Sequence, residues 1–191
     1  KCNCRENAVN IFYLDKDPVV AAQLQCDKHV VKMIVESAQM LSTAHRMLDG
    51  VETRRPSLSG RMGKYWALPD ARETLLYKAV HMAHPCTVWT MQSNNNYTWH
   101  WIHFDALCKE YTHRYGKVHK TDENLRMALR ELPRNIEVAP FCALPLAMGA
   151  APECRDVNDR IGSYRKFYQT KQARFKMAWT KREIPDWFQV A

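Results

Sequence analysis

The stretch from Asp27 to Leu48 constrains the fold more than any other part of the chain, because it contains neither glycine nor proline. Its apolar side chains recur at steps of three or four residues, as on one face of an α-helix: Val31, Ile34, Val35, Ala38, Leu41, Ala44 and Leu48. Asp27 stands where an N-cap carboxylate can accept from free backbone N–H groups. We therefore expect a central, largely buried helix over Asp27–Arg46.

A second line of side chains follows the same period beside the apolar face: His29, Lys32, Glu36 and Gln39. Two interpretations are open. Either these residues are the solvated side of a core helix, or they present an acid, a base and a cation to a cleft. On the second interpretation His29, Glu36 or Asp27 acts as general base or orienting acid, and Lys28 or Lys32 offers positive charge to a phosphate.

Length and composition fit one mainly helical domain over residues 1–191. Of the 191 residues 46% are hydrophobic, so the chain can bury a sizeable core. The formal net charge of +8 favours a polyanionic partner such as DNA. No apolar run approaches the ~20 residues that span a bilayer, so we expect no membrane partner.

The cysteines argue against a structural zinc site and for a reducing compartment. Seven are scattered along the chain, and only Cys2 and Cys4 form a close pair. No Cys-x-x-Cys pair is present, which argues against a zinc ribbon or finger. We expect neither a bound metal nor a cofactor. No apolar signal-peptide core is seen, which favours a cytoplasmic location.

The remaining pattern predicts a mainly α fold, a multi-helix orthogonal bundle with at most one or two short strands near the N-terminus. The strand candidate is Val9–Leu14. The other expected helices cover Pro18–Gln25, Asp70–Ala83, Pro85–Met91, a long segment from Ser93–Asn96 to Gly116, Thr121–Leu132 and Val157–Trp179. Irregular segments are expected at 1–8 (a loose N-terminus), 49–64 (a basic loop) and 133–153 (a proline-rich connector). The basic loop is either a mobile connector or an arm that touches phosphates.

The helix that ends near Gly116 is rich in histidine, with His100, His103 and His113. The spacing of these residues could hold a metal ion. Neither a His-Glu-x-x-His motif nor a repeated Glu-x-x-His motif accompanies them, however. We therefore favour a buried histidine hydrogen-bonded within the core for at least one of the three.

The C-terminal segment from Arg155 to Arg182 is strongly basic, with nine basic residues against two acids. Aromatic side chains are interleaved with the cations, and this combination can hold phosphates and stack bases. Lys171, Arg174 and Arg182 are the candidate nucleic-acid contacts. The alternative is a helix that packs its aromatic side chains inward and leaves its cations in solvent.

Five groups of residues together carry a resemblance: Asp27-Lys28-His29-Val30-Val31-Lys32-Met33 with Glu36, Gln39 and His45; His84-Pro85 with Trp89; Asn96-Tyr97; Glu110-Tyr111 with Arg114-Tyr115-Gly116-Lys117 and His119; and Trp179-Thr180-Lys181-Arg182-Glu183-Ile184-Pro185-Asp186-Trp187. They resemble a phage-encoded helical protein family of little-known function, over nearly the whole chain from Asn10 onward. The chain is also loosely similar to phage enzymes that hypermodify thymine in viral DNA and are related in fold to DNA glycosylases. That similarity implies a viral DNA-modification protein in which an amine displaces pyrophosphate from an activated 5-hydroxymethyluracil.

The leading hypothesis is an enzyme that modifies or excises a pyrimidine base in DNA, either a transferase or a glycosylase. Such chemistry needs a pocket for an unstacked base, lined by aromatic and amide side chains. Residue types of this kind occur together in Trp89, Asn94, Asn95, Asn96 and Tyr97, and Arg114 is a further candidate contact. We expect His29 and Glu36 to face a polar cleft shared with the Asn94–Tyr97 turn, with the carboxylate raising the pKa of the histidine and the nearby Lys32 opposing that rise.

Two alternatives belong to other classes. A non-catalytic accessory protein that coats nucleic acid or binds a host partner would explain the basic C-terminal segment without any role for Asp27, His29 and Glu36. A small-molecule enzyme with a metal held by histidines and carboxylates would instead use the histidine-rich helix, and metal analysis of the purified protein tests that case.

Overall fold

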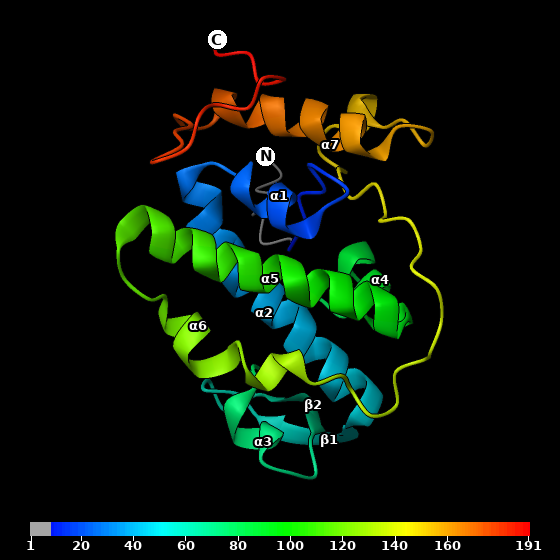
Figure 1. Ribbon diagram of the computed structural model, residues 1–191. Helices are drawn as coiled ribbons and strands as arrows, with labels where there is room; N and C mark the ends of the chain where they lie inside the picture. The colour runs from blue at the N-terminus through cyan, green and yellow to red at the C-terminus, as the bar shows by residue number, and fades with distance from the viewer. Residues whose placement is uncertain (1–8) are drawn as a thin grey trace.

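The computed structural model describes residues 9–191, so the expectation of a loose N-terminus at 1–8 lies outside the described residues. The fold is mainly α, as expected (Figure 1). The α-helices are α1 (Pro18–Gln23), α2 (Asp27–Asp49), α3 (Arg72–Leu75), α4 (Pro85–Gln92), α5 (Asn94–Tyr115), α6 (Lys120–Leu125) and α7 (Arg160–Gln169). Short 3₁₀ turns follow at Ala128–Arg130, Pro152–Cys154 and Thr170–Ala173. No helix within residues 9–191 is long and apolar enough to cross a bilayer.

Helix α2 runs through the middle of the molecule, which confirms the expected central helix. The side chains of Ile34, Ala38, Leu41 and Ala44 are all fully buried. Helix α5 crosses α2 and covers one of its sides, and α7 lies near the opposite end of the molecule from the sheet (Figure 1). Helix α2 ends at Gly50, where a Cβ atom would stand 2.4 Å from the Arg46 carbonyl oxygen, so only glycine fits this close approach.

Local capping explains where the other long helix begins and ends. Ser93 is the N-cap of α5, and its hydroxyl accepts from the Asn96 amide. Gly116 follows the helix with φ +66°, the left-handed conformation that glycine adopts without strain. The predicted long helix ending near Gly116 is therefore confirmed.

The strands lie in a different part of the chain from the one expected. Val9–Leu14 forms no strand, although Val9, Ile11, Phe12 and Leu14 are buried in the core. The segment expected to be a basic loop instead forms an antiparallel hairpin of β1 (Val51–Pro56) and β2 (Met62–Ala67), in which Val51 is opposite Ala67 and Arg54 is opposite Lys64. Its strands bury neither face, so they lack the alternation of apolar and polar residues that marks a half-buried strand.

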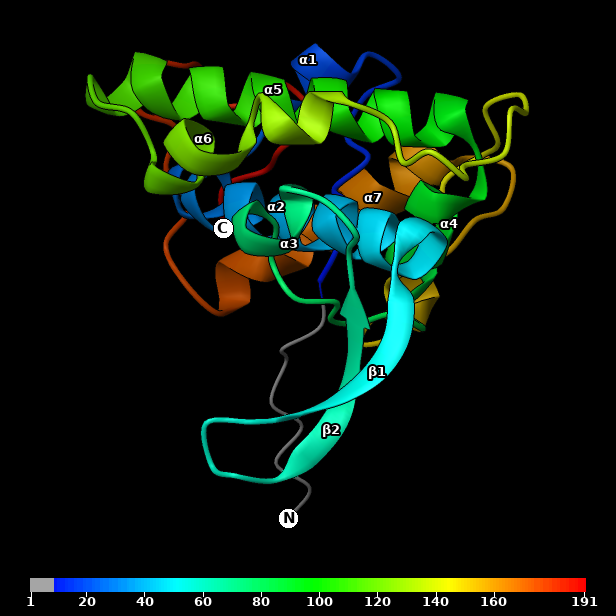
Figure 2. The same cartoon turned by 90° about the horizontal axis from the view of Figure 1, so that it is seen from below.

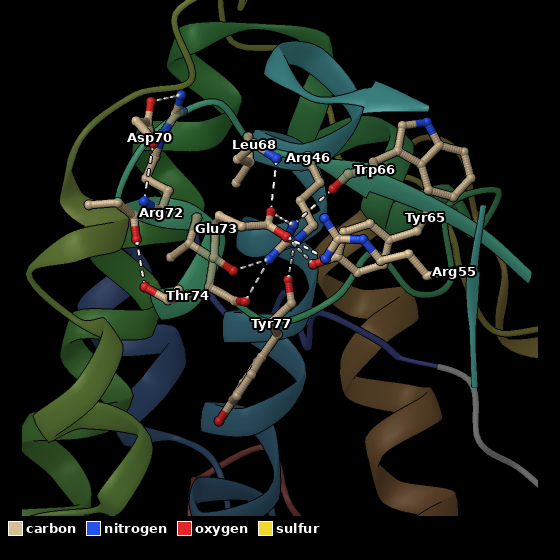
Figure 3. Close-up of polar contacts among 12 residues, drawn as sticks. Arg46, Arg55, Tyr65, Trp66, Leu68, Asp70, Arg72, Glu73, Thr74 and Tyr77 are labelled. Carbon is tan, nitrogen blue, oxygen red and sulfur yellow. Dashed lines mark hydrogen bonds and ion pairs between the residues drawn. The ribbon is translucent and has the colours of Figure 1, made fainter. Parts of the chain in front are cut away.

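An ion pair between a buried arginine and a partly exposed glutamate fixes the root of this hairpin to α2 (Figure 3). Arg46, at 1% exposure, pairs with Glu73 at 2.7 Å and donates to the Trp66 carbonyl at 2.8 Å. Glu73 in turn accepts from the Tyr65 hydroxyl at 2.5 Å and from the Arg55 guanidinium at 2.9 Å. A single arginine of α2 thus holds the second strand and the segment after it.

Three predicted helices are shorter than expected. In place of Asp70–Ala83 only Arg72–Leu75 is helical, because Arg46 binds the carbonyls of Leu76 and Tyr77 that would otherwise continue the helix. Thr121–Leu132 shortens to Lys120–Leu125 and a 3₁₀ turn. Val157–Trp179 shortens to Arg160–Gln169 with its own turn. Beyond that turn the chain docks on the N-terminal half, where the Trp179 indole donates to the Leu24 carbonyl at 2.8 Å.

Candidate functional site

A cavity of about 600 Å³ lies beside the first half of α2. Its walls come from α2, the segment before α1, the start of α4, the connector before α7, and α7 with the turn after it. The lining residues are Asn10, Phe12, Lys28, His29, Lys32, Met33, Glu36, His84, Pro85, Leu146, Ala147, Gly149, Ala150, Arg155, Phe167, Lys171, Arg174 and Phe175. The cavity is therefore assembled from distant parts of the sequence around the polar edge of α2.

Five cationic side chains line this cavity. Lys28 and Lys32 are one turn apart on α2 and so share a face. Arg155, Lys171 and Arg174 come from the C-terminal part of the chain. Cations from two directions around one concave surface favour a ligand with more than one negative charge.

Aromatic rings form the other half of the lining. The Phe12 ring stacks on the His29 imidazole with centroids 4.7 Å apart, and the Phe175 ring meets His29 edge-on at 5.4 Å. Lys28 lies over the Phe175 ring at 4.3 Å, and Lys171 lies over the Phe167 ring at 4.0 Å. The cavity thus combines flat apolar surfaces with positive charge, which suits a planar ring that carries phosphate groups.

His29 is held as a neutral imidazole. Its Nδ1 atom and the Tyr168 hydroxyl share a hydrogen bond of 2.8 Å, and the ring is 6% exposed. Burial, together with the positive charges of Lys171, Lys32 and Lys28, lowers the pKa of His29 to about 3. The expectation that a carboxylate raises this pKa is therefore wrong, since desolvation and cations dominate around the ring.

Glu36 lines the same cavity but binds other partners. Its Oε2 atom accepts from the backbone N–H of Asn10 at 3.1 Å, and its Oε1 atom is 3.1 Å from the Lys32 ammonium. Burial raises the pKa of the Glu36 carboxyl, although Lys32 acts to lower it. The cavity therefore holds a neutral histidine, which can accept a hydrogen bond, and a carboxyl that takes up a proton more readily than usual and is the better base of the two.

Asp27, the third predicted catalytic residue, belongs to an ion-pair network instead. Its carboxylate accepts from the Arg114 guanidinium at 2.9 Å and from the backbone and hydroxyl of Thr180 at 2.8 and 2.7 Å. Arg114 also binds Glu110 at 2.8 Å, and Arg182 pairs with Glu110 at 2.9 Å. Asp27, Arg114 and Arg182 thus join α2, α5 and the C-terminal segment, and none of them lines the cavity.

The asparagines of the first turn of α5, Asn94, Asn95 and Asn96, do not line the cavity with His29 and Glu36. Asn94 and Asn95 bind the backbone of Ala139 at 3.1 and 2.8 Å, and Asn96 binds the backbone of Cys142 at 3.0 Å. These asparagines hold the proline-rich connector in place. The predicted cleft shared between the Asn94–Tyr97 turn and the edge of α2 is therefore wrong.

The two predicted aromatic contacts nearby are also engaged within the fold. The Trp89 indole donates to the Cys142 carbonyl at 2.9 Å. The Tyr97 hydroxyl donates to the Leu129 carbonyl at 2.8 Å and shares a hydrogen bond with His45, also at 2.8 Å. Neither residue lines the cavity.

Two of the three histidines of α5, His100 and His103, are buried and hydrogen-bonded within the protein, whereas His113 is exposed. His100 contacts the hydroxyls of Thr90 at 2.8 Å and Ser37 at 3.1 Å. His103 contacts the Pro18 carbonyl at 2.9 Å and the Gln25 side chain at 3.2 Å. Among residues 9–191, no group of three or more histidine, cysteine, aspartate or glutamate side chains is arranged to hold a metal ion.

Twelve of the eighteen lining residues are not among the site residues expected from the sequence, and they include Phe12, Arg155, Phe167 and Phe175. Phe12 sits in the segment expected to be a strand. The two other phenylalanines and Arg155 lie within the basic-aromatic segment that also contains Lys171 and Arg174. The aromatic residues of that segment were the available signal, but nothing local indicated which of them face α2.

Comparison with known proteins adds no second line of evidence. No protein-family model matches the chain, and neither characterised proteins nor solved structures show a significant match to it. The functional argument therefore rests on the geometry and chemistry of the cavity.

Proposed function

We propose that the protein is a DNA-acting enzyme that takes one pyrimidine nucleotide out of the base stack into the cavity beside α2 and modifies its base. One observation carries the proposal: His29, Glu36, Lys28, Lys32 and a basic-aromatic wall converge on one concave surface. Cavities of about 300–1,000 Å³ hold ligands of drug-like size, so the volume of about 600 Å³ suits a single nucleotide unit.

The cations and rings supply binding. Phenyl rings such as Phe12 and Phe175 offer faces or edges against which a planar base can pack, a contact worth about 1–3 kcal/mol per base. Lys28, Lys32 and Arg155 supply charge for phosphate groups, either of the polymer backbone or of an activating group on the base.

Glu36 supplies proton transfer, with His29 beside it as a hydrogen-bond acceptor. Burial raises the pKa of Glu36, so its carboxylate can accept the proton of an attacking amine or water, while the neutral His29 can accept a hydrogen bond from the same group. In the reaction that the resemblance implies, the amine nitrogen bonds to the methylene carbon of activated 5-hydroxymethyluracil while the carbon–oxygen bond to pyrophosphate breaks. The proton lost by the nitrogen passes to the Glu36 carboxylate, and the departing pyrophosphate stays among the lysines and arginines.

Turnover of modified oligonucleotides tests the proposal. A short DNA strand that carries pyrophosphorylated 5-hydroxymethyluracil is incubated with the protein and a diamine, and the nucleosides are then analysed by mass spectrometry. We expect Glu36→Gln to lower the rate about 10²–10⁴-fold, the usual contribution of a general acid or base. His29→Ala should also lower the rate, because the attacking group loses a hydrogen-bond acceptor.

The matched controls are His113→Ala and Glu123→Gln, whose side chains are exposed and do not line the cavity. Both controls should keep the wild-type rate. Wild-type rates in His29→Ala and Glu36→Gln, with both variants folded, would disprove the acid–base roles.

A further inference from the structure

The β1–β2 hairpin projects from the helical body as an isolated ribbon (Figure 2). It leaves the end of α2 on the side turned away from α5. From residue 54 to residue 64 every side chain is exposed, and Leu58 at the tip is fully so. A two-stranded ribbon without a packed face is marginal in water by itself.

The hairpin is nevertheless held rigidly at its root. Arg46 donates to carbonyls of Trp66, Leu76 and Tyr77 at 2.8, 3.0 and 2.6 Å, while its guanidinium pairs with Glu73 (Figure 3). This arrangement fixes the direction in which the ribbon leaves α2. A loop that only joined two helices would not need a buried arginine to aim it.

The charge on the ribbon is strongly one-sided. Residues 51–67 carry four cations, Arg54, Arg55, Arg61 and Lys64, against the single acid Glu52. Arg54 and Lys64 are directly opposite each other in the register, and like charges in that position destabilise a ribbon. The Lys64 ammonium forms an ion pair with the Glu52 carboxylate at 2.9 Å, and the Arg55 guanidinium forms one with Glu73. A polyanion along the stem would offset the repulsion that remains.

We propose that this hairpin is an arm that lies in the major groove of the duplex that flanks the nucleotide held in the cavity. The major groove of B-DNA admits a two-stranded ribbon. Arg54, Arg61 and Lys64 then face phosphates, and Leu58 at the tip makes apolar contact with sugars or bases. The inference rests on the proposed function, because the duplex is placed there by the nucleotide in the cavity.

The geometry also predicts how far the arm reaches. The axis of α2 between Lys32, at the cavity, and Gly50, at the root of the hairpin, is about 27 Å long at ~1.5 Å per residue. That length corresponds to about eight base pairs at ~3.4 Å each. A duplex that extends at least that far from the target nucleotide is needed to engage the arm.

Binding measurements with two DNA lengths test the arm. Fluorescence anisotropy compares the variant Arg54→Ala/Arg61→Ala/Lys64→Ala with the control Lys117→Ala/Lys120→Ala/Arg130→Ala, which removes the same charge from exposed positions elsewhere. On a duplex with about sixteen base pairs on each side of the target, we expect the arm variant to bind at least about tenfold more weakly and its salt slope to fall by about three. Leu58→Ala should weaken binding to the same duplex and leave the salt slope unchanged.

The short DNA separates the arm from the cavity. On a single strand of about four nucleotides the arm variant should bind like the wild type. If the arm variant binds the long duplex with wild-type affinity and salt slope, the hairpin does not contact DNA. The same conclusion follows if the control variant loses as much affinity as the arm variant. If the arm effect appears while His29→Ala keeps full turnover, the proposed chemistry fails and the arm stands.

Discussion

At the residue scale, the chemistry of α2 depends on which side of the helix each side chain occupies. Ile34 and Leu41 are fully buried, whereas Val31, from the same apolar series, is 38% exposed. His29 and Glu36 lie between these extremes, buried from bulk water but lining the cavity. One helix thus supplies both the core and the reactive edge.

Truncation of the buried face should be costly. We expect Ile34→Ala and Leu41→Ala each to lower the free energy of unfolding by about 2–5 kcal/mol, because each leaves a cavity in a packed core. Urea unfolding followed by circular dichroism measures the loss. Val31→Ala is the control and should cost much less. A loss below about 0.5 kcal/mol at both Ile34 and Leu41 would show that α2 is peripheral.

At the element scale, the sequence predicted those elements whose signals are local. The period of α2 and the Ser93 and Gly116 ends of α5 are read directly from neighbouring residues. The hairpin was missed because an exposed ribbon has no apolar alternation. The helix at Asp70–Ala83 was overestimated because its carbonyls are bound by Arg46, which is distant in sequence.

The candidate site divides in the same way. Helical spacing correctly grouped His29, Lys32 and Glu36 on one edge, and composition singled out Lys171 and Arg174. That these sets line one cavity, and that the asparagines of the Asn94–Tyr97 turn instead hold the connector, follows from tertiary packing. No local pattern encodes that packing.

The turn after α7 gives an element-scale prediction. We expect Lys171→Ala/Arg174→Ala to weaken binding of single-stranded DNA and to flatten the dependence of log affinity on log salt, because two charges are removed from the cavity wall. Anisotropy titrations at several salt concentrations measure both quantities. Lys117→Ala/Lys120→Ala serves as the control of equal charge. An unchanged slope in the double variant would remove this turn from the binding surface.

At the scale of the whole molecule, buried neutral histidines should make the fold sensitive to acid. Burial lowers the pKa of His29 to about 3, of His45 and His103 to about 4, and of His100 well below its usual value. Below pH 6.5 these histidines bind protons in the unfolded chain but remain neutral in the folded chain. Stability is therefore full above pH 6.5 and falls as the pH drops toward 4.

Removing one of these groups should flatten that fall. His103→Gln keeps hydrogen-bonding groups but cannot titrate, so its unfolding free energy should depend less steeply on pH, by up to ~1.4 kcal/mol per pH unit. Urea unfolding at a series of pH values between 4 and 7 measures the slope. The exposed His113→Gln should leave it unchanged. A wild-type slope in His103→Gln would mean that His103 is not held neutral by burial.

Photocrosslinking tests most directly whether the cavity beside α2 takes up a pyrimidine base. A short single-stranded oligonucleotide with one 5-iodouracil is bound to the protein and irradiated, and the attachment site is mapped by mass spectrometry of peptides. We expect attachment at the rings that line the cavity, Phe12, His29, Phe167 or Phe175. Attachment confined to residues outside the cavity, such as Trp89 or Tyr97, would show that the base does not bind there.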